Sequence, residues 1–416
     1  MSCFLIEGGN PLSGEIKVQG AKNAVLPILS ASLLNRGRTV LKNCPDLSDV
    51  SVAVEILKSL GCRVKRRGDI IETDSSCADK YVIPHRLMNK MRSSVMFLGS
   101  ILGRNKKAVI SYPGGCDLGA RPIDLHIKAL RELNVETEEE LGVILCVSEE
   151  IRGCEIYLDF PSVGATENII LASVLGKGKT VILNPAKEPE IVDLQNFINQ
   201  MGGDVKGCGT DRIEINGVKE LHSAEYEIMP DRIVTATYLF AAAGTGGNIK
   251  VNNIGRESLE SVCRVLEEMG AELKCESGSI ELEAPKKIRA VNVETKVYPG
   301  FPTDAQPLLA PCLCFADGRS HITENIFSRR FMYASQLNKM NADISIAGNT
   351  MTVNPVRKLM GATVYAQDLR GGAALVLAGL MAHGTTRVAN THFIERGYEN
   401  TEEIINFLGG NIKRVQ

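Results

Sequence analysis

The sequence has no excess of charge of either sign and no long apolar run. Its 416 residues carry 47 lysines and arginines against 49 aspartates and glutamates, so the net charge is -2 and the isoelectric point is near 6.4. Proteins that bind nucleic acid usually have a clear basic excess, so nucleic acid is not expected as a partner. The most apolar stretch, 373–382, is too short to cross a bilayer, and the N-terminal segment does not resemble a signal peptide. We therefore expect a cytoplasmic protein without membrane insertion.

Common metal and nucleotide motifs are also missing. The six histidines stand apart from one another, and neither CxxC nor HExxH nor the phosphate-binding GxxxxGK[ST] pattern occurs. Cys312 and Cys314 form a close pair, but they lie in an apolar run that is typical of a core. The twelve cysteines are scattered through a long chain, which favours reduced core residues over a disulfide framework. We expect no bound metal.

What the sequence does contain is one pattern of about seventy residues that recurs along the chain. Each copy has a polar start, an apolar helix, a glycine or basic turn, a β-branched strand ending in Asn or Pro, and an amphipathic helix. The copies begin near residues 22, 92, 164, 232, 304 and 370. Strands are predicted at 213–218 and 279–285. Because six such units exceed one core, we expect an α/β fold with two lobes of three units each, and a substrate cleft between the lobes.

Basic side chains recur at the predicted helix starts, where Lys22, Arg92, Arg232 and Arg370 stand. A helix N-terminus favours acids, so recurrent bases indicate a shared polyanionic ligand. The alternative is that these side chains only decorate helix ends. Asn23 adds a carboxamide beside Lys22, a combination that suits a phosphate or a carboxylate.

Cys116 has a different setting from the other cysteines. It lies in SYPGGCDLGAR, among glycines, so we predict that it is exposed on a mobile loop. Arg121 would favour the thiolate, whereas a protonated thiol could act as a general acid. An incidental loop cysteine is the alternative interpretation.

The second half of the chain supplies a carboxylate and several arginines. Asp304 follows a proline turn at the start of a predicted helix, where a carboxylate is usually a cap. Because surface arginines are common, none of the following is informative alone: Arg329, Arg330, Arg370 and Arg396, with Asp368 close to Arg370.

Taken together, these motifs resemble the UDP-N-acetylglucosamine 1-carboxyvinyltransferases, the MurA family of enolpyruvyl transferases. The resemblance covers essentially the whole chain in the family's order, through GAKNAVLPIL, MRSSVMFLG, PGGCDLGARPIDLH, PSVGATENI, EPEIVDLQNF, PDRIVTATYL, FPTDAQ, RFMY, DLRGGAALVLAG and ERGYE. It implies a two-lobed inverse α/β barrel of the EPSP synthase-like kind. Residues 1–21 and 230–416 would form a discontinuous lobe I, and residues 22–229 would form lobe II with the Cys116 loop. The active site would lie in the cleft between them.

The resemblance also implies the reaction. The 3'-hydroxyl of UDP-N-acetylglucosamine adds to C2 of phosphoenolpyruvate, C3 is protonated, and phosphate leaves from a tetrahedral intermediate. This is the first committed step of peptidoglycan synthesis. It needs no cofactor, and it links the protein to cell wall biogenesis, cell shape and cell division and makes it a target of fosfomycin.

Site residues are implied by the same resemblance. Cys116 would donate the proton to C3, and Asp304 would take the proton of the 3'-hydroxyl. The catalytic residues would be Cys116, Asp304, Lys22 and Arg396. Phosphoenolpyruvate would be bound by Lys22, Asn23, Arg121 and Arg396, with Arg330 and Arg370 as further contributors. UDP-N-acetylglucosamine would be bound by Arg92, Arg121, Pro122, Ile123, Asp124, Leu125, Pro161, Ser162, Val163, Gly164, Asp304 and Ile326.

Two positions depart from the family pattern. Phe160 stands where some members have a lysine, and Val234 stands where others often carry an acid. Three alternatives stay open. The chain could be the sister enzyme that acts on shikimate 3-phosphate, an inactive paralogue that binds the UDP-sugar, or a thiol sensor built around Cys116. The presence of the glycine-rich cysteine loop and of the complete catalytic set favours the UDP-sugar enzyme. The sequence does not predict an oligomeric state.

Overall fold

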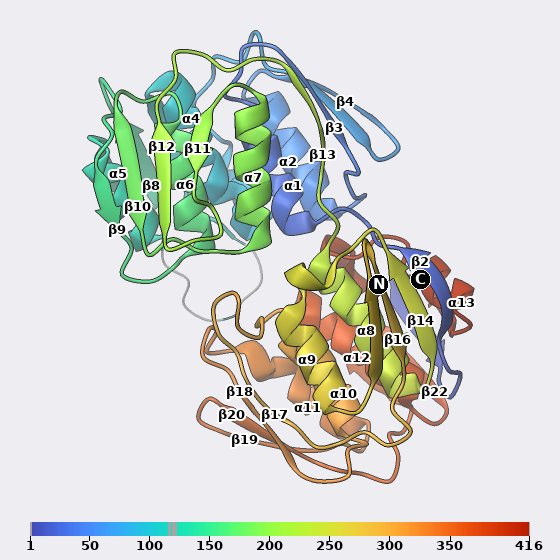
Figure 1. The fold of residues 1–416 in the computed structure, drawn as a ribbon. Helices are drawn as coiled ribbons and strands as arrows, with labels where there is room; N and C mark the ends of the chain where they lie inside the picture. Colours follow the sequence, from blue (N-terminus) through green and yellow to red (C-terminus); the bar gives the residue numbers. More distant parts are fainter. Residues whose placement is uncertain (1, 115–117, 119–122, 416) are drawn as a thin grey trace. The chain divides into compact units, whose positions relative to one another are not determined.

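The computed structural model describes residues 2–114, Leu118 and residues 123–415. Within them the chain divides into two compact units (Figure 1). Unit 1 contains residues 2–19, Leu118 and residues 230–415, and unit 2 contains residues 20–114 and 123–229. Each unit has its own hydrophobic core.

Unit 1 is built from three mixed sheets and the helices that pack on them. The sheet orders are β15-β16-β14-β2, β17-β18-β20-β19 and β21-β22-β1-β23. The strands are β1 (Cys3–Glu7), β2 (Ser13–Lys17), β14 (Asn248–Asn252), β15 (Glu272–Glu276), β16 (Ser279–Glu283), β17 (Asn292–Glu294), β18 (Ser320–Thr323), β19 (Asp343–Ala347), β20 (Thr350–Asn354), β21 (Thr363–Tyr365), β22 (Thr385–Ala389) and β23 (Asn411–Val415). The α-helices are α8 (Arg232–Thr245), α9 (Glu260–Glu268), α10 (Gln306–Leu313), α11 (Ala334–Lys339), α12 (Leu369–Met381) and α13 (Thr401–Phe407). Three 3-10 turns are η2 (Arg256–Ser258), η3 (Arg330–Tyr333) and η4 (Thr391–Arg396).

Unit 2 repeats the same plan. Its sheet orders are β13-β3-β5-β4, β6-β8-β7 and β11-β12-β10-β9. The strands are β3 (Arg38–Lys42), β4 (Arg63–Arg67), β5 (Ile70–Asp74), β6 (Lys107–Ser111), β7 (Glu136–Glu140), β8 (Val143–Val147), β9 (Glu155–Tyr157), β10 (Lys179–Leu183), β11 (Asp204–Lys206), β12 (Arg212–Asn216) and β13 (Ala224–Glu227). The helices are α1 (Lys22–Ala31), α2 (Ser48–Ser59), α3 (His85–Met88), α4 (Phe97–Asn105), α5 (Asp124–Glu132), α6 (Val163–Ser173) and α7 (Pro189–Gln200), with the 3-10 turn η1 (Arg92–Met96).

The first helix of each repeat lies inside its unit. In α8, α10 and α12 of unit 1 nearly every side chain is buried, and these three helices pack against one another (Figure 1). In unit 2, α1, α4 and α6 are buried in the same way. A helix that is apolar on all sides is stable only when neighbours surround it. The apolar runs of the sequence therefore become the centres of the two units.

The second helix of each repeat is amphipathic and buries one side only. In α2, Ile56 and Leu57 are buried while Lys58 lies outside, and in α9 Val262 and Leu266 are buried. A stripe of this kind covers one face of a sheet or core and leaves charged residues in water. The predicted strands at 213–218 and 279–285 correspond to β12 and β16, so the repeat inferred from the sequence is confirmed.

An asparagine ends the first long strand in four of the repeats. Asn43, Asn184, Asn253 and Asn390 follow β3, β10, β14 and β22, and all four have positive φ, between 54° and 64°. Asparagine tolerates this left-handed backbone better than most residues because its short polar side chain can bond locally. The recurrent Asn therefore reverses the chain toward the second helix.

The N-terminal strands belong to unit 1, although most of that unit is encoded at the other end of the chain. β1 lies between β22 and β23, with Phe4 opposite both Val388 and Arg414. β2 pairs in parallel with β14. Unit 1 is thus closed by strands from both ends of the sequence.

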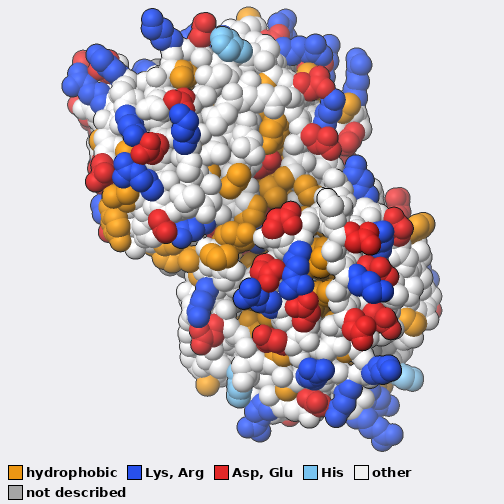
Figure 2. Space-filling view, viewed as in Figure 1, with side chains coloured by type: hydrophobic (Ala, Val, Ile, Leu, Met, Phe, Trp, Pro, Cys, Tyr) orange, Lys and Arg blue, Asp and Glu red, His pale blue; other side chains and the backbone are white. Residues whose placement is uncertain are grey.

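The surface carries charges of both signs. On the face seen in Figure 2, basic and acidic side chains are interspersed over both units. Among the described residues no helix is long and apolar enough to span a membrane, and no three His, Cys, Asp or Glu side chains group as metal ligands. The cysteines that the structure describes are all free thiols.

Candidate active site

In unit 1 the carboxylate of Asp304 lies between two guanidinium groups. Arg330 Nη2 donates to Asp304 Oδ1 at 2.6 Å, and Arg370 Nε donates to Asp304 Oδ2 at 3.2 Å. The side chains of both arginines are only 2% exposed, whereas the side chain of Asp304 is 30% exposed. The sequence placed these three residues far apart, and the fold brings them together with the carboxylate as the accessible member.

Further contacts hold Arg330 in place. Its Nε and Nη2 atoms donate to the carbonyl of Thr303 at 3.1 and 3.0 Å, and its Nη1 atom lies 3.7 Å from Asp368 Oδ1. Asp368 is the N-cap of α12 and accepts from the backbone amides of Arg370 and Gly371 at 3.0 and 2.9 Å. The same cap that starts α12 therefore also faces the guanidinium of Arg330.

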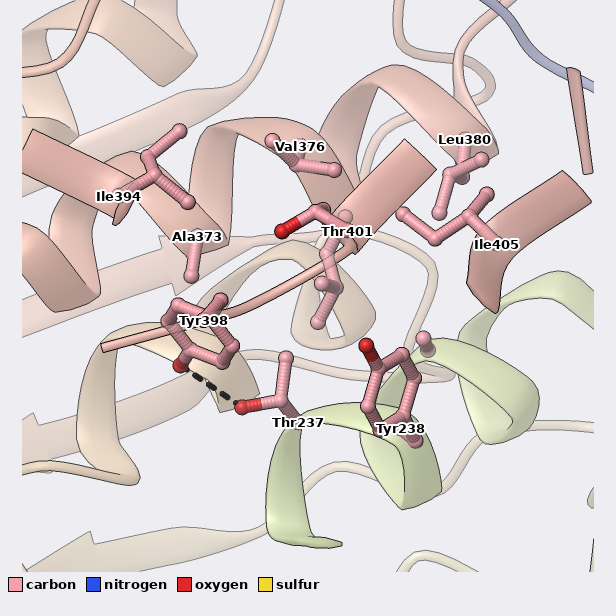
Figure 3. A pocket seen from close by; sticks show the side chains of 11 residues that line it. Thr237, Tyr238, Ala373, Val376, Leu380, Ile394, Tyr398, Thr401 and Ile405 are labelled. Carbon is pink, nitrogen blue, oxygen red and sulfur yellow. Dashed lines mark hydrogen bonds between the residues drawn. The ribbon is translucent and has the colours of Figure 1, made fainter. Parts of the chain in front are cut away.

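Arg370 rests on Tyr398. The guanidinium lies 5.3 Å from the centre of the Tyr398 ring, and the Tyr398 hydroxyl, which is also hydrogen-bonded to Arg370, lies 2.9 Å from Thr237 Oγ1 (Figure 3). Burial lowers the pKa of Arg370, but Tyr398, Asp304 and Asp231 more than offset this effect, so the pKa lies above its ordinary value. Among the described residues, no acceptor is found for the buried Nη1 of Arg370. A buried cation with an unused donor suits an anionic oxygen.

The cavity drawn in Figure 3 lies in unit 1 between α8, α12 and α13. Its walls are mainly aliphatic, with Val376, Leu380 and Ile405 among them, and Tyr238 and Tyr398 contribute rings. This lining carries no ionised side chain. The cavity therefore lies in the packing around Tyr398, which contacts Arg370, and its lining offers no charged group to a ligand.

In unit 2 the predicted lysine forms a buried ion pair. Lys22 is the first residue of α1, and its Nζ lies 2.7 Å from Oδ2 of Asp49 in the first turn of α2. The exposed fractions of the two side chains are 9% and 4%. Asn23 follows on α1 and is half-buried. A buried pair of this kind is costly to break, because either partner alone would be an uncompensated charge.

The predicted nucleotide-sugar residues of unit 2 lie at three helix starts. Arg92 begins η1, and residues 123–125 span the N-cap and first turn of α5, with Ile123 buried and Asp124 exposed. Residues 161–164 span the start of α6, where Ser162 Oγ accepts from the Ala165 amide at 3.4 Å. The charges of Arg92 and Asp124 both act on His126, whose ring packs against Gly164, so the three starts are neighbours.

The remaining predicted residues are placed separately or lie outside the described residues. The amide of Ile326 donates to Glu324 Oε1 at 2.8 Å, and Arg396 is the last residue of η4. Cys116, Arg121 and Pro122 fall outside the residues that the structure describes. Of the two family departures, Phe160 is 46% exposed beside the start of α6, and Val234 is 1% exposed inside α8.

Sequence reasoning missed several buried polar residues. Asp49 and Tyr398 were not singled out, nor were His126, Glu167 and Asn168 of unit 2. Glu167 is 0% exposed, and neither of its carboxyl oxygens has a hydrogen-bond partner within residues 2–114, Leu118 and 123–415. Burial, followed by Glu190 and Glu188, raises its pKa well above the ordinary value. The polar pair within GATENIILAS, an otherwise apolar helix, was the signal that could have revealed Glu167 and Asn168.

Comparison with known proteins identifies the class. The family model described as EPSP synthase (3-phosphoshikimate 1-carboxyvinyltransferase) matches residues 6–405. The fold is that of the enolpyruvyl transferase NikO from Streptomyces tendae, with a TM-score of 0.91 at 23% identity over 100% of this chain and 99% of that chain. It is also that of EPSP synthase from Acinetobacter baumannii, with a TM-score of 0.77 at 18% identity over 100% of both chains. The chain belongs to the EPSP synthase family of enolpyruvyl transferases.

Closer relatives narrow the class. UDP-N-acetylglucosamine 1-carboxyvinyltransferase 2 from Caldanaerobacter subterraneus subsp. tengcongensis is 50% identical over 416 residues, 100% of both chains. UDP-N-acetylglucosamine 1-carboxyvinyltransferase from Geobacter metallireducens is 42% identical over 416 residues, again 100% of both. Within the family the chain groups with the UDP-N-acetylglucosamine 1-carboxyvinyltransferases, and the predicted family and fold are confirmed.

Proposed function

We propose that this protein transfers the enolpyruvyl group of phosphoenolpyruvate to the 3'-hydroxyl of UDP-N-acetylglucosamine and releases phosphate. The chain is 50% identical over its full length to a protein named UDP-N-acetylglucosamine 1-carboxyvinyltransferase 2, and this identity supports the choice of substrates. The structural observation that carries the proposal is the accessible carboxylate of Asp304 between the buried guanidinium groups of Arg330 and Arg370. A proton acceptor beside fixed cations is what the addition of a hydroxyl to an anionic donor requires.

Phosphoenolpyruvate carries a phosphate and a carboxylate, so it needs several cations. Unit 1 supplies Arg330 and Arg370. The Nη1 atom of Arg370, which has no acceptor among the described residues, suits an anionic oxygen of phosphoenolpyruvate. Unit 2 supplies Lys22. The proposal adds Asn23, Arg121 and Arg396 on the strength of the family resemblance.

The addition step requires that Asp304 accept a proton. As the 3'-oxygen bonds to C2 of phosphoenolpyruvate, its proton passes to Asp304, and C3 gains a proton that we assign to the Cys116 thiol. In the elimination step C3 returns a proton to the Cys116 thiolate and the bond from C2 to the phosphate oxygen breaks. The phosphate leaves with the proton that Asp304 had taken. The products are the enolpyruvyl ether and phosphate.

In the ligand-free state both guanidinium groups hydrogen-bond the carboxylate of Asp304. An anionic donor that binds Arg330 and Arg370 takes up some of their hydrogen bonds. The carboxylate then accepts a proton more readily, so donor binding and base activation are linked. Asp304 therefore becomes a better proton acceptor when phosphoenolpyruvate is bound, so the arginine contacts stabilise the transition state more than the ligand-free enzyme.

The acceptor half of the proposal uses unit 2. Arg92, residues 121–125 and residues 161–164 would hold the nucleotide sugar, with Asp304 and Ile326 on unit 1. Phe160 stands where some family members have a lysine, so in this proposal one diphosphate contact is either missing or replaced. The reaction would be the first committed step of peptidoglycan synthesis in the cytoplasm, with a role in cell shape and division and with fosfomycin as an inhibitor.

The deciding experiment measures phosphate release from phosphoenolpyruvate by the purified chain, with UDP-N-acetylglucosamine and with shikimate 3-phosphate in parallel. We expect release with the UDP-sugar alone, and an enolpyruvyl ether of it by mass spectrometry. Release with shikimate 3-phosphate alone would assign the chain to the sister reaction. A folded protein without either activity would overturn both.

Cys116→Ala tests the assigned proton donor. Turnover should be lost while binding of UDP-N-acetylglucosamine, measured by calorimetry, is kept. Cys77→Ala is the matched control, because Cys77 is an exposed thiol in the part of the chain that the structure describes. Unchanged turnover in Cys116→Ala would remove the cysteine from the mechanism.

A further inference from the structure

Asn168 of α6 is fully buried, and the orientation of its carboxamide is determined by its neighbours. The backbone N–H of Gly99 donates to Oδ1 of Asn168 at 2.6 Å. Because a backbone N–H can only donate, this contact identifies the oxygen of the amide. The nitrogen Nδ2, which has two hydrogens and can only donate, lies 3.2 Å from the Val95 carbonyl and 3.2 Å from the Gly164 carbonyl. Its shortest contact, at 2.8 Å, is with Nδ1 of His126.

This orientation also determines the tautomer of His126. Since Asn168 Nδ2 donates to Nδ1, the neutral imidazole must carry its proton on Nε2. The ring stays neutral, because burial lowers the pKa of His126 to about 4, with Arg92 lowering it further and Asp124 opposing the shift. At the pH of a cell, His126 is therefore a fixed N–H donor.

The donating edge of the ring faces the start of α6. A Cβ placed on Gly164 would lie 2.9 Å from Cε1 and 3.3 Å from Nε2 of His126. Among the described residues none accepts a hydrogen bond from Nε2. The N-terminus of an eleven-residue helix favours negative charge, and the basic side chain of Arg92 acts on the same ring.

We propose that Asn168 is a positioning residue that holds His126 as a neutral Nε2–H donor for an anionic oxygen of the acceptor's diphosphate at the start of α6. The proposal rests on the proposed function for its ligand. Asn168 connects η1 and α4, through Val95 and Gly99, to α5 and to α6. One carboxamide thus sets the direction of the donor and the spacing of the three helix starts.

The first test uses the unmodified chain. With 15N-labelled histidine, long-range 1H–15N spectra report the tautomer of each of the six histidines, and His126→Gln identifies the signal of His126. We expect the Nε2–H tautomer, unchanged between pH 5.5 and 8 (about one unit or more above the pKa). We also expect the Nε2–H signal to move on adding uridine diphosphate but not on adding uridine. An Nδ1–H tautomer, or no response to the diphosphate, would overturn the proposal.

The second test is Asn168→Asp, which keeps the shape but replaces the donor with a carboxylate. The carboxylate pulls a proton onto Nδ1 of His126, so the ring should titrate near neutral pH. Binding of UDP-N-acetylglucosamine should weaken at least tenfold, while KM for phosphoenolpyruvate stays within about twofold. Equal affinity in a folded Asn168→Asp protein would contradict the role.

The matched control is Asn199→Asp in the same unit. Asn199 also bonds through both amide atoms, to the backbone of Val205, and among the described residues its side chain has no hydrogen bond to a histidine. Asn199→Asp should lose about as much stability as Asn168→Asp, but it should not change the His126 signal or the affinity for the UDP-sugar. If the chain binds uridine diphosphate but releases no phosphate in the turnover assay, the proposed function is wrong. The 1H–15N spectra of His126 still decide the role of Asn168 in that case.

Discussion

The two units share one repeat but satisfy their buried polar groups differently. In unit 1 the groups around Asp304 form ion pairs, which join carboxylates to the guanidinium groups of Arg330 and Arg370. In unit 2 one ion pair, Lys22 with Asp49, accompanies a neutral network in which Asn168 donates to His126.

The difference shows what each arrangement is suited to do. Ionised groups keep a strong field where a ligand or a proton brings or removes charge, provided that partners offset their burial. A neutral network instead determines which atom donates and in which direction, and it is insensitive to pH over a wide range. A threefold α/β frame therefore supports either kind of site, depending on a few side chains at the helix starts.

Asp304→Asn breaks the ionised cluster and should have the largest effect. The amide keeps the shape and the contact with one arginine but cannot take a proton, so kcat should fall by roughly 10²–10⁴-fold. Phosphate release measures the rate, and calorimetry should show that uridine diphosphate still binds. Asp343→Asn, on the exposed part of β19, is the control. A rate above about one tenth of the wild-type value would mean that Asp304 is structural.

Gly164→Ala breaks the neutral network of unit 2. The added methyl group would lie 2.9 Å from Cε1 of His126, closer than side-chain carbons approach, so the ring or α6 must shift. Overpacking of this kind costs about 1–3 kcal/mol, and UDP-sugar binding should weaken by roughly five- to a hundredfold. Gly318→Ala, whose Cβ would meet Ala290 at an ordinary 3.4 Å, should bind normally. Full affinity in Gly164→Ala would show that the contact is free to adjust.

Tyr398→Phe tests how far the position of Arg370 in unit 1 depends on its neighbours. It removes the hydroxyl that bonds Thr237 and Arg370 but keeps the ring beneath the guanidinium. A hydrogen bond to a charged group is worth about 1.5–3 kcal/mol, so KM for phosphoenolpyruvate should rise roughly ten- to a hundredfold. The pH optimum should stay where it is.

Tyr238→Phe is the matched control for that variant. Tyr238 lines the same cavity as Tyr398 (Figure 3) and is buried to a similar degree. Among the described residues, Arg370 has a hydrogen bond to the hydroxyl of Tyr398 but none to that of Tyr238. If both variants raise KM equally, the effect arises from packing and not from the position of Arg370.

The sequence predicted the repeated helices and strands better than the partners of the buried polar side chains. Apolar periodicity and the recurrent turns were enough for six repeats, because burial of whole helices leaves a strong pattern. The partners of Asp304 could not be predicted from spacing, since Arg330 and Arg370 meet it only through the packing of η3 and α12. The direction of the Asn168 amide depends on Gly99, which lies on another helix.

Glu167 is marked in the sequence only as a polar residue within an apolar helix, and it gives the prediction with the smallest expected effect. Both of its oxygens lack hydrogen-bond partners in the described part of the chain, and its pKa lies well above the ordinary value because of burial and then of Glu190 and Glu188. An unfolded chain releases this proton near pH 4.5, whereas the folded chain holds it to higher pH. The stabilisation is therefore complete below about pH 4.5 and is lost as the pH rises through the folded pKa.

Glu167→Gln keeps the shape and cannot ionise, so its advantage in unfolding free energy should grow as the pH rises from 5 to 8. We expect a gain of about 1 kcal/mol or more at pH 8, seen as a rise in Tm of about 2–4 °C, with little change in kcat. Scanning fluorimetry across this pH range measures the difference, and Glu136→Gln on the exposed strand β7 should show none. A Glu167→Gln protein that is equally stable at every pH would mean that Glu167 is ionised in the fold. Unit 2 would then contain a further buried charge besides the ion pair of Lys22 and Asp49. The contrast between the ion pairs around Asp304 and the neutral groups on α6 would not hold.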